Sequence, residues 1–206
     1  MAQPVNDFGL FCGATATNAA NLHQLMVSTP TRRSFVAGYE GMSEGLDRVA
    51  LGVDCDLVHG NILIGDAGAA QNVAYLNRLG VTHVLNMAEG NGPGMVPTSA
   101  LTYAGTGISY CGFPALDQPA FDIAHYFGQA VTFMDSCEAN GKILVHCLRG
   151  RSRSPAVVLA YLMIRRTVPA PMAMKLCCSA RAFHINAGFL EQLSELHNSL
   201  CVAANT

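Results

Sequence analysis

Residues 146–154 combine the side chains that phosphate chemistry requires. They read His-Cys-Leu-Arg-Gly-Arg-Ser-Arg-Ser and lie between an apolar run and a predicted helix. A tight turn that leads into a helix directs free backbone N–H groups at one point, which suits a tetrahedral anion. Gly150 lets the backbone bend close to that anion. This segment therefore predicts an oxyanion-binding loop.

Cys147, at the start of this turn, is the predicted nucleophile. The field of the helix N-terminus and the charge of Arg153 both favour the thiolate, so we expect a lowered pKa for Cys147. A thiolate that faces a bound phosphate can attack phosphorus. Arg153 can present its planar guanidinium to two phosphate oxygens. The alternative for Cys147 is a buried structural thiol.

Positive charge is concentrated around this loop. Residues 142–181 contain eight of the twelve Lys and Arg residues and no Asp or Glu, although the formal net charge is only −2. This distribution predicts an anionic ligand, and the alternative is a solvated basic face that pairs with acids elsewhere. No nucleic-acid partner is expected, because the overall charge gives no support for one.

The elements around the loop alternate between strands and helices. Short buried strands are predicted at residues 61–65, 82–87, 107–112 and 142–146. Helices are predicted at residues 67–79, 119–139 and 154–166, in a shorter segment that ends near residue 181, and at 187–202. Pro119 suits the first position of the second helix, Asn140-Gly141 its end, and Ser154-Pro155 the cap and first residue of the third. This order predicts an α/β domain with a central, mostly parallel sheet of about five strands flanked by helices.

Residues 1–46 differ in composition from the remainder of the chain. They are rich in small and polar residues and lack a sustained apolar period, so we expect a flexible or loosely docked tail before a catalytic-sized domain at residues 47–206. The longest apolar run, residues 155–164, is about half the roughly 20 residues that a membrane-crossing helix needs, so no membrane span is expected. The first 25 residues contain no Lys or Arg, so we expect no secretory signal and a location in the cytoplasm or nucleus.

The cysteines and histidines give no metal-binding pattern. The eight cysteines are scattered and include no Cys-x-x-Cys pair, and the seven histidines are not at zinc spacing. Most cysteines are expected to be reduced thiols, with Cys177 and Cys178 packed in the core. No metal is expected, and the oligomeric state is left open.

The Cys-x5-Arg pattern, preceded by His146 and followed by Ser154, resembles the cysteine-dependent protein phosphatases and, within them, the dual-specificity branch. The chain has no Trp, whereas tyrosine-specific relatives carry their acid on a Trp-Pro-Asp loop, and residues 113–117 read Phe-Pro-Ala-Leu-Asp. A stretch of about 46 residues before the domain leaves no room for a kinase-docking domain, so the chain is similar to the small, atypical members. The resemblance extends to residues 80–86, 117–127, 142–146, 158–163 and 186–190.

The resemblance implies a role for individual residues. Cys147 would form a phosphocysteine, while Arg153 would bind phosphate and stabilise the transition state. Ser154 would donate a hydrogen bond to the departing sulfur, and His146 would orient the loop. Asp117 would protonate the leaving oxygen and then activate water. The residues expected to bind substrate are Leu148, Arg149, Gly150, Arg151, Ser152 and Arg181.

The roles of Asp117 and Arg181 each have an alternative. Asp122 is a second candidate acid, although a carboxylate in the first turn of a helix is already favoured by the helix dipole. Arg181 aligns with a position where relatives hold a second phosphate, but an Arg at a helix end can instead be solvated or bind carbonyls. Asn186 is expected to support neighbouring backbone.

The resemblance implies a phosphoprotein phosphatase that acts on phosphotyrosine and on phosphoserine or phosphothreonine, without a metal or organic cofactor. Its expected partner is a phosphorylated protein, with a protein kinase as one candidate. Arg149 and Arg151 are unusual, because relatives commonly place small, apolar or acidic residues there and phosphoinositide phosphatases carry basic residues in this loop. A phosphoinositide or another polyanionic ester is therefore the alternative substrate. A low-turnover scaffold that binds phosphorylated partners is the alternative function.

Overall fold

The computed structural model describes residues 16–32, 36–39, 48–137 and 141–204. Five strands form one sheet in the order β1-β2-β5-β3-β4: β1 (Cys55–His59), β2 (Ile62–Gly65), β3 (Val81–Asn86), β4 (Ser109–Gly112) and β5 (Lys142–His146). β1 runs antiparallel to β2, and the other neighbours are parallel. The expected mostly parallel sheet of about five strands is confirmed, although β1 was not among the predicted strands.

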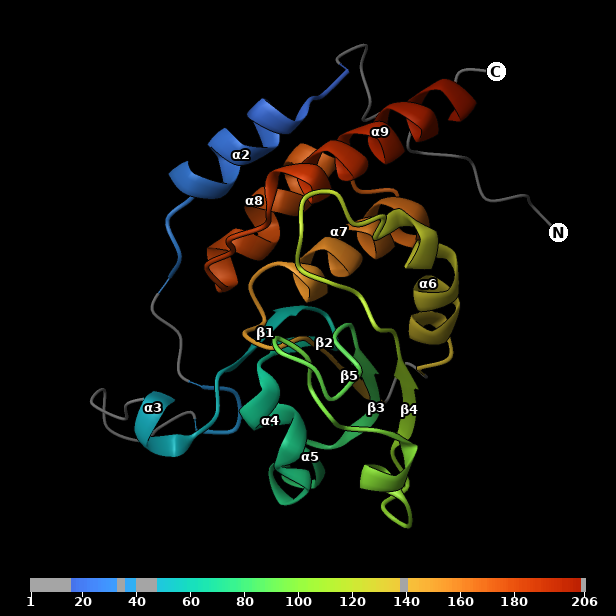
Figure 1. Ribbon diagram of the computed structural model, residues 1–206. Helices are drawn as coiled ribbons and strands as arrows, with labels where there is room; N and C mark the ends of the chain where they lie inside the picture. Colours follow the sequence, from blue (N-terminus) through green and yellow to red (C-terminus); the bar gives the residue numbers. More distant parts are fainter. Residues whose placement is uncertain (1–15, 33–35, 40–47, 138–140, 205–206) are drawn as a thin grey trace, which may run out of the picture.

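Helices cover both faces of this sheet (Figure 1). One face carries α4 (Ala67–Gln71) and α5 (Val73–Leu79). The other carries α6 (Phe127–Asp135), α7 (Arg153–Arg166), α8 (Ala170–Ala180) and α9 (Ala187–Ala204). Successive strand residues alternate between the two faces, so Leu144 and Val145 of β5 lie in different hydrophobic clusters. The remaining elements are α2 (Ala19–Ser28), α3 (Arg48–Leu51), and the short 3₁₀ helices η1 (Ala100–Tyr103) and η2 (Ala124–Tyr126).

The two central elements of the molecule meet at residues 147–152. β5 pairs with β2 on one side and β3 on the other, and four of its five residues are buried. α7 is buried continuously from Arg153 to Met163, as expected for a helix that is enclosed on all sides. The loop between them is therefore fixed at both ends by rigid, buried structure.

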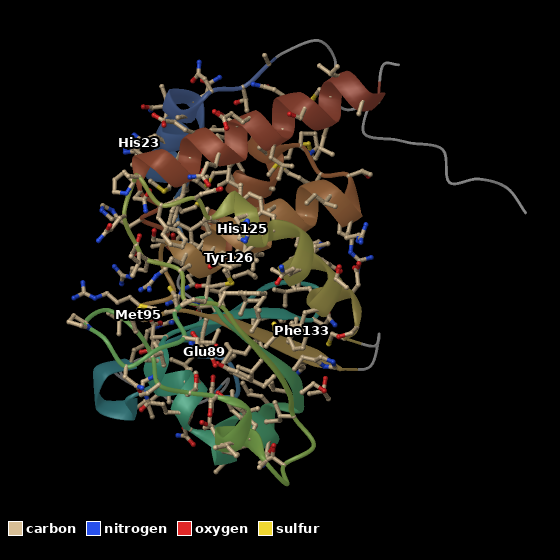
Figure 2. The ribbon with its side chains drawn as sticks, turned by 45° about the vertical axis from the view of Figure 1, so that its right-hand side comes forward. His23, Glu89, Met95, His125, Tyr126 and Phe133 are labelled. Atoms are coloured by element: carbon tan, nitrogen blue, oxygen red, sulfur yellow. The ribbon has the colours of Figure 1, made fainter. Side chains whose placement is uncertain are left out.

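The predicted helix at residues 119–139 is wrong over its first turns. Helical structure begins only at η2 and α6, because the polar groups of the preceding backbone bond to α9 instead. Gln192 donates to the Phe121 carbonyl at 2.9 Å and accepts from the Ala124 N–H at 2.9 Å. Tyr126, labelled in Figure 2, packs its ring on Phe113 at 4.9 Å between centroids. Pro119 therefore lies in a loop fixed by side chains rather than at a helix start, and Asn140 lies outside the described residues.

Two other helix boundaries also differ from the prediction. The segment at residues 67–79 is two helices, because the Asn72 side chain accepts from the Tyr75 N–H at 3.0 Å and caps a second helix. α7 begins at Arg153 rather than after Ser154, with Ser152 at the cap position. Ser154 and Pro155 are consequently inside the first turn. Ser154 does not cap the helix, and its hydroxyl contacts Cys147 instead.

The expectation of a loosely docked N-terminal tail is wrong for residues 17–28. α2 packs against α8 and α9, and Leu22 and Met26 are buried in the larger core. Thr17 exchanges two backbone hydrogen bonds of 3.0 Å with the Asn198 side chain of α9. The spacing of the two buried side chains is helical, and this short apolar stripe accounts for the docking. Residues 1–15, 33–35 and 40–47 of the predicted tail lie outside the described residues.

The positions of two cysteines agree with a further expectation. Cys177 and Cys178 are buried in α8. Among the described residues, no helix combines the length and apolar character needed to cross a bilayer. The cysteines found as free thiols are Cys55, Cys111, Cys137, Cys147, Cys177 and Cys178.

Gly188 should be essential for seating α9 against the loop that contains Pro119. A Cβ atom at Gly188 would lie 1.8 Å from the Pro119 carbonyl oxygen. We expect Gly188→Ala to lower the free energy of unfolding by about 3 kcal/mol, measured by urea denaturation. Gly128 is the matched control, because it is also the second residue of its helix and a Cβ there meets nothing within 4 Å. Gly128→Ala should raise stability by about 0.5 kcal/mol, and equal effects of the two substitutions would contradict this packing.

Candidate active site

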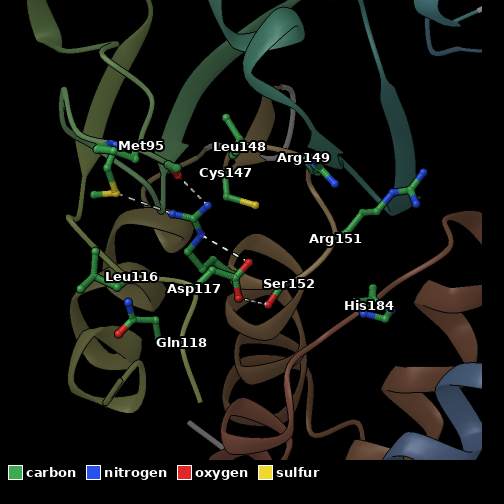
Figure 3. A pocket seen from close by; sticks show the side chains of 13 residues that line it. Met95, Leu116, Asp117, Gln118, Cys147, Leu148, Arg149, Arg151, Ser152 and His184 are labelled. Atoms are coloured by element: carbon green, nitrogen blue, oxygen red, sulfur yellow. Dashed lines mark hydrogen bonds and ion pairs between the residues drawn. The ribbon is translucent and has the colours of Figure 1, made fainter. Parts of the chain in front are cut away.

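A cavity of about 350 Å³ opens at the carboxyl end of β5 (Figure 3). It contains the predicted nucleophile and the predicted acid, which are 30 positions apart in sequence. The loop at 147–153 forms one wall, and segments near residues 94 and 117 form another. The lining residues are Pro93, Gly94, Met95, Leu116, Asp117, Gln118, Cys147, Leu148, Arg149, Arg151, Ser152, Arg153 and His184.

The Cys147 thiol is placed where its ionised form is stabilised. The residue is only 1% exposed, and burial by itself would raise the pKa of the thiol. The charge of Arg153, the Ser154 hydroxyl and the N–H groups of Ser154 and Gly150 act in the opposite direction, and together they lower the pKa of Cys147 below its ordinary value. The Ser154 Oγ lies 3.3 Å from the sulfur. The sequence-based expectation of a lowered pKa thus agrees with the geometry.

The backbone of the loop turns its carbonyls away from the sulfur. Four successive carbonyl oxygens accept hydrogen bonds from groups outside the loop, and the N–H of a peptide points opposite to its carbonyl. Each of these carbonyls shares a peptide unit with the N–H of the following residue. The N–H groups of residues 149–152 are thereby directed to the cavity side, where an oxyanion could accept hydrogen bonds from them. The four bonds are Ala67 N–H to Leu148 O (3.1 Å), Arg181 Nη2 to Arg149 O (3.0 Å), Arg181 Nε to Gly150 O (2.8 Å) and His184 N–H to Arg151 O (2.8 Å).

Arg153 holds a free donor inside the cavity wall. Its side chain is buried, and its terminal nitrogens donate to the Ala115 carbonyl at 3.0 Å and the Gly94 carbonyl at 2.9 Å. The Nε atom has no hydrogen-bond partner and lies 3.9 Å from Oδ2 of Asp117 (Figure 3). A buried N–H without an acceptor is costly unless a ligand completes it. The guanidinium therefore fits an anionic ligand at this position.

Asp117 lies over the loop, with one oxygen held by two hydrogen bonds and the other in the ion pair with Arg153. Oδ1 accepts from the Ser152 hydroxyl at 2.6 Å and from the Asn186 amide at 2.9 Å. The rival candidate, Asp122, is exposed, accepts from the His125 N–H at 3.2 Å and does not line the cavity. The geometry thus favours Asp117 as the acid.

Asn186 has a role that the sequence reasoning missed. Its Oδ1 accepts from the Phe189 N–H at 3.0 Å, which agrees with the expected support of backbone, but its Nδ2 also holds Asp117. The only sequence signal was its place in a family-like segment, since the contact joins residues 69 positions apart.

His146 acts on the loop as a neutral group. The ring is fully buried, and this burial lowers the pKa of His146 to about 4. Its Nδ1 lies 3.4 Å from the Cys147 carbonyl oxygen, where the neutral tautomer protonated on Nδ1 donates a hydrogen bond. His146 can therefore orient the start of the loop, but at neutral pH it adds no positive charge.

The expectation that Arg181 binds substrate is wrong, because Arg181 does not face the cavity. Its side chain is buried, forms ion pairs with Asp54 and Asp56, and lies outside the cavity lining. Its hydrogen bonds to loop carbonyls correspond to the carbonyl-binding alternative. Asp54 and Asp56 were not identified from the sequence, because the strand that contains Asp56 was not predicted.

Arg149 and Arg151 lie exposed at the rim of the cavity. Within the described ranges, neither forms an ion pair with a carboxylate, whereas Arg153, Arg165 and Arg181 of the same basic segment pair with acids elsewhere in the fold. Leu148 and Ser152 also line the cavity, whereas Gly150 contributes through its backbone. In the same part of the chain, no three His, Cys, Asp or Glu side chains gather closely enough to hold a metal ion.

Comparisons with known proteins agree with this geometry. Residues 62–199 match the family described as "Dual specificity phosphatase, catalytic domain". Human dual specificity protein phosphatase 26 is 40% identical over 147 residues, which cover 70% of this chain and 68% of that protein. The same protein from Pongo abelii matches equally well.

Solved structures of similar proteins share the fold. The crystal structure of human DUSP28 has a TM-score of 0.59 and 32% identity, and the match covers 71% of this chain and 94% of that one. A mouse putative dual specificity phosphatase, solved in complex with zinc tungstate, has a TM-score of 0.63 and 30% identity, with 80% and 96% covered. The chain belongs to the dual-specificity phosphatase family and is a phosphatase of the atypical group within the protein tyrosine phosphatase superfamily.

Proposed function

We propose that this phosphatase hydrolyses phosphotyrosine and phosphoserine or phosphothreonine in proteins through a phosphocysteine intermediate. The observation that carries the proposal is the buried Cys147 sulfur, which faces inward-directed N–H groups and has a lowered pKa. The mouse relative supports an oxyanion ligand, since tungstate is tetrahedral like phosphate. Membership of the family supports phosphoproteins as the substrate class.

In the first step, the Cys147 thiolate attacks phosphorus and the bond to the leaving oxygen breaks. Loop N–H groups and the free Nε of Arg153 bind the three phosphoryl oxygens, whose charge they stabilise in the transition state. Protonated Asp117 gives its proton to the leaving oxygen. Since Oδ1 already accepts two hydrogen bonds, Oδ2 carries that proton.

In the second step, water attacks phosphorus and the phosphorus–sulfur bond breaks. The Asp117 carboxylate takes a proton from the water, and inorganic phosphate leaves. Cys147 returns to the thiolate form, and the Ser154 hydroxyl, at 3.3 Å, donates a hydrogen bond to the sulfur as its charge develops. No further group is required to balance the two steps.

Cys147→Ser should abolish turnover of an aryl phosphate while substrate binding is retained. We expect kcat to fall by at least about 10⁴-fold, because a serine hydroxyl is un-ionised in this site. Steady-state kinetics and trapping of wild-type phosphocysteine by rapid acid quench provide the measurement. A wild-type rate in the variant would refute the nucleophile, and binding without turnover in the wild-type protein would support the scaffold alternative.

Asp117→Asn should slow the hydrolysis of esters with poor leaving groups far more than that of good ones. We expect kcat/KM, which reports the first step, to fall by about 10²-fold on phenyl phosphate and much less on p-nitrophenyl phosphate, whose leaving oxygen needs no proton. Asp122→Asn is the matched control and should leave both rates near wild type. If Asp122→Asn shows the leaving-group dependence instead, Asp122 is the acid.

A second candidate substrate, a phosphoinositide or another polyanionic ester, is favoured by the exposed side chains of Arg149 and Arg151. These two cations flank the cavity that holds the nucleophile and could bind a second anionic group. We rank it below a phosphoprotein because the family is one of protein phosphatases.

Comparing substrates under one buffer condition decides between these two candidates. We expect phosphotyrosine and phosphothreonine peptides to have a higher kcat/KM than a soluble phosphoinositide, and a neighbouring acidic residue to raise the peptide value about 5-fold. The double variant Arg149→Gln/Arg151→Gln should remove that preference for acidic neighbours. Lys142→Gln is the control, because it removes a charge at the opposite end of β5 from Cys147. A higher kcat/KM for the phosphoinositide would overturn the ranking.

A further inference from the structure

Among the described residues, two arginines and two aspartates, all buried or half-buried, form a cluster behind the catalytic loop. Arg181, only 4% exposed, donates to Asp56 at 2.7 Å and to Asp54 at 2.8 Å. Arg48 of α3 donates to the same two carboxylates, at 2.7 Å for Asp56. Burial would raise the pKa of Asp54, but the two arginines lower it below its usual value. Asp54 is therefore ionised at neutral pH, and the ion pairs of the cluster fix the Arg181 guanidinium in place.

The same guanidinium also bonds to the loop that contains the nucleophile. Arg181 Nη2 donates to the Arg149 carbonyl at 3.0 Å, and Nε donates to the Gly150 carbonyl at 2.8 Å. The Arg149 carbonyl and the Gly150 N–H belong to one peptide unit and point in opposite directions. This N–H is one of two backbone donors, with the N–H of Ser154, that lower the pKa of the Cys147 thiol.

The backbone at Gly150 can rotate in ways that other residues cannot, so its orientation must be fixed from outside. Its φ angle of +63° lies in the left-handed region. A Cβ atom would lie 2.5 Å from the Gly65 carbonyl oxygen and 2.9 Å from Arg181 Nη2. No side chain can therefore be added here to stiffen the turn, and the two bonds from Arg181 supply that constraint.

We propose that Arg181, held by Asp54 and Asp56, is a positioning residue that keeps the Gly150 peptide turned toward the Cys147 sulfur. This inference rests on the proposed function, because it concerns the nucleophile of that reaction. It assigns Arg181 to the rear of the loop rather than to a second phosphate. Asp54 and Asp56 thereby affect the reaction indirectly: they hold Arg181, and Arg181 holds the loop carbonyls.

Other charged and titratable groups near the sulfur come from several elements, and substituting Arg181 leaves their identities unchanged. The shift is therefore measured as the difference from the wild-type protein, in which the same groups are present. They are Arg153 of α7, His146 of β5, Asp117 before η2, Arg149 and Arg151 of the loop itself, and His184 before α9.

The test measures the pH dependence of Cys147 alkylation by iodoacetamide in the full chain, without substrate, using mass spectrometry of the Cys147 peptide. Arg181→Met should move the alkylation midpoint to higher pH, because the thiolate loses an oriented N–H donor. The acidic limb of kcat/KM should move in the same direction, and kcat should fall about 10- to 100-fold. Arg165→Met, which removes an exposed arginine that pairs with Asp135, is the control and should leave the midpoint unchanged.

Arg181→Lys separates positioning from charge. It keeps the positive charge but cannot present the planar set of donors that reaches two carboxylates and two carbonyls, so we expect a shift in the same direction as in Arg181→Met. A wild-type midpoint in Arg181→Lys would show that charge alone matters and would overturn the inference. If Arg181→Met fails to fold, Asp54→Asn loosens the same guanidinium and should give a smaller shift of the same sign.

The two proposals fail in different ways. An ordinary thiol midpoint in the wild-type protein would contradict the proposed function itself. A lowered wild-type midpoint that Arg181→Lys and Asp54→Asn both leave unchanged would contradict only the role of Arg181.

Discussion

A sulfur anion enclosed by protein is stable only if fixed dipoles and charges replace the water it has lost. In this phosphatase, inward-directed N–H groups, the Ser154 hydroxyl and Arg153 meet that requirement for Cys147. Because the same donors suit phosphoryl oxygens, one arrangement both ionises the nucleophile and prepares the substrate site. The rest of the fold can be understood as support for this arrangement.

The support comes from elements distributed along the whole chain. β5 and α7 fix the two ends of the loop, the start of α4 bonds to the Leu148 carbonyl, and the connection from α8 to α9 supplies Arg181 and the His184 N–H. The segment that carries Asp117 and Phe121 is fixed in turn by Asn186, directly before α9, and by Gln192 of α9. Since each contact comes from a different element, the site depends on the complete α/β architecture rather than on the loop alone.

The sequence predicted what depends on local pattern. Apolar runs identified four of the five strands, and the spacing of Cys147 and Arg153 identified the loop. Contacts between distant residues could not be read in the same way. The Gln192 side chain replaces helical hydrogen bonds near Phe121, so the predicted helix began too early. Arg181 pairs with acids more than 120 positions away, so the sequence left its role open. In α2, the polar composition obscured a short apolar stripe that docks the helix.

Asn186 uses one end of its amide for α9 and the other for Asp117. The acid is therefore held beside the loop that carries the nucleophile, and moving it away would break its bonds to Ser152 and Asn186. In such a preorganised site, the free energy of substrate binding is not used to position the proton donor. More of it can therefore stabilise the transition state of phosphoryl transfer.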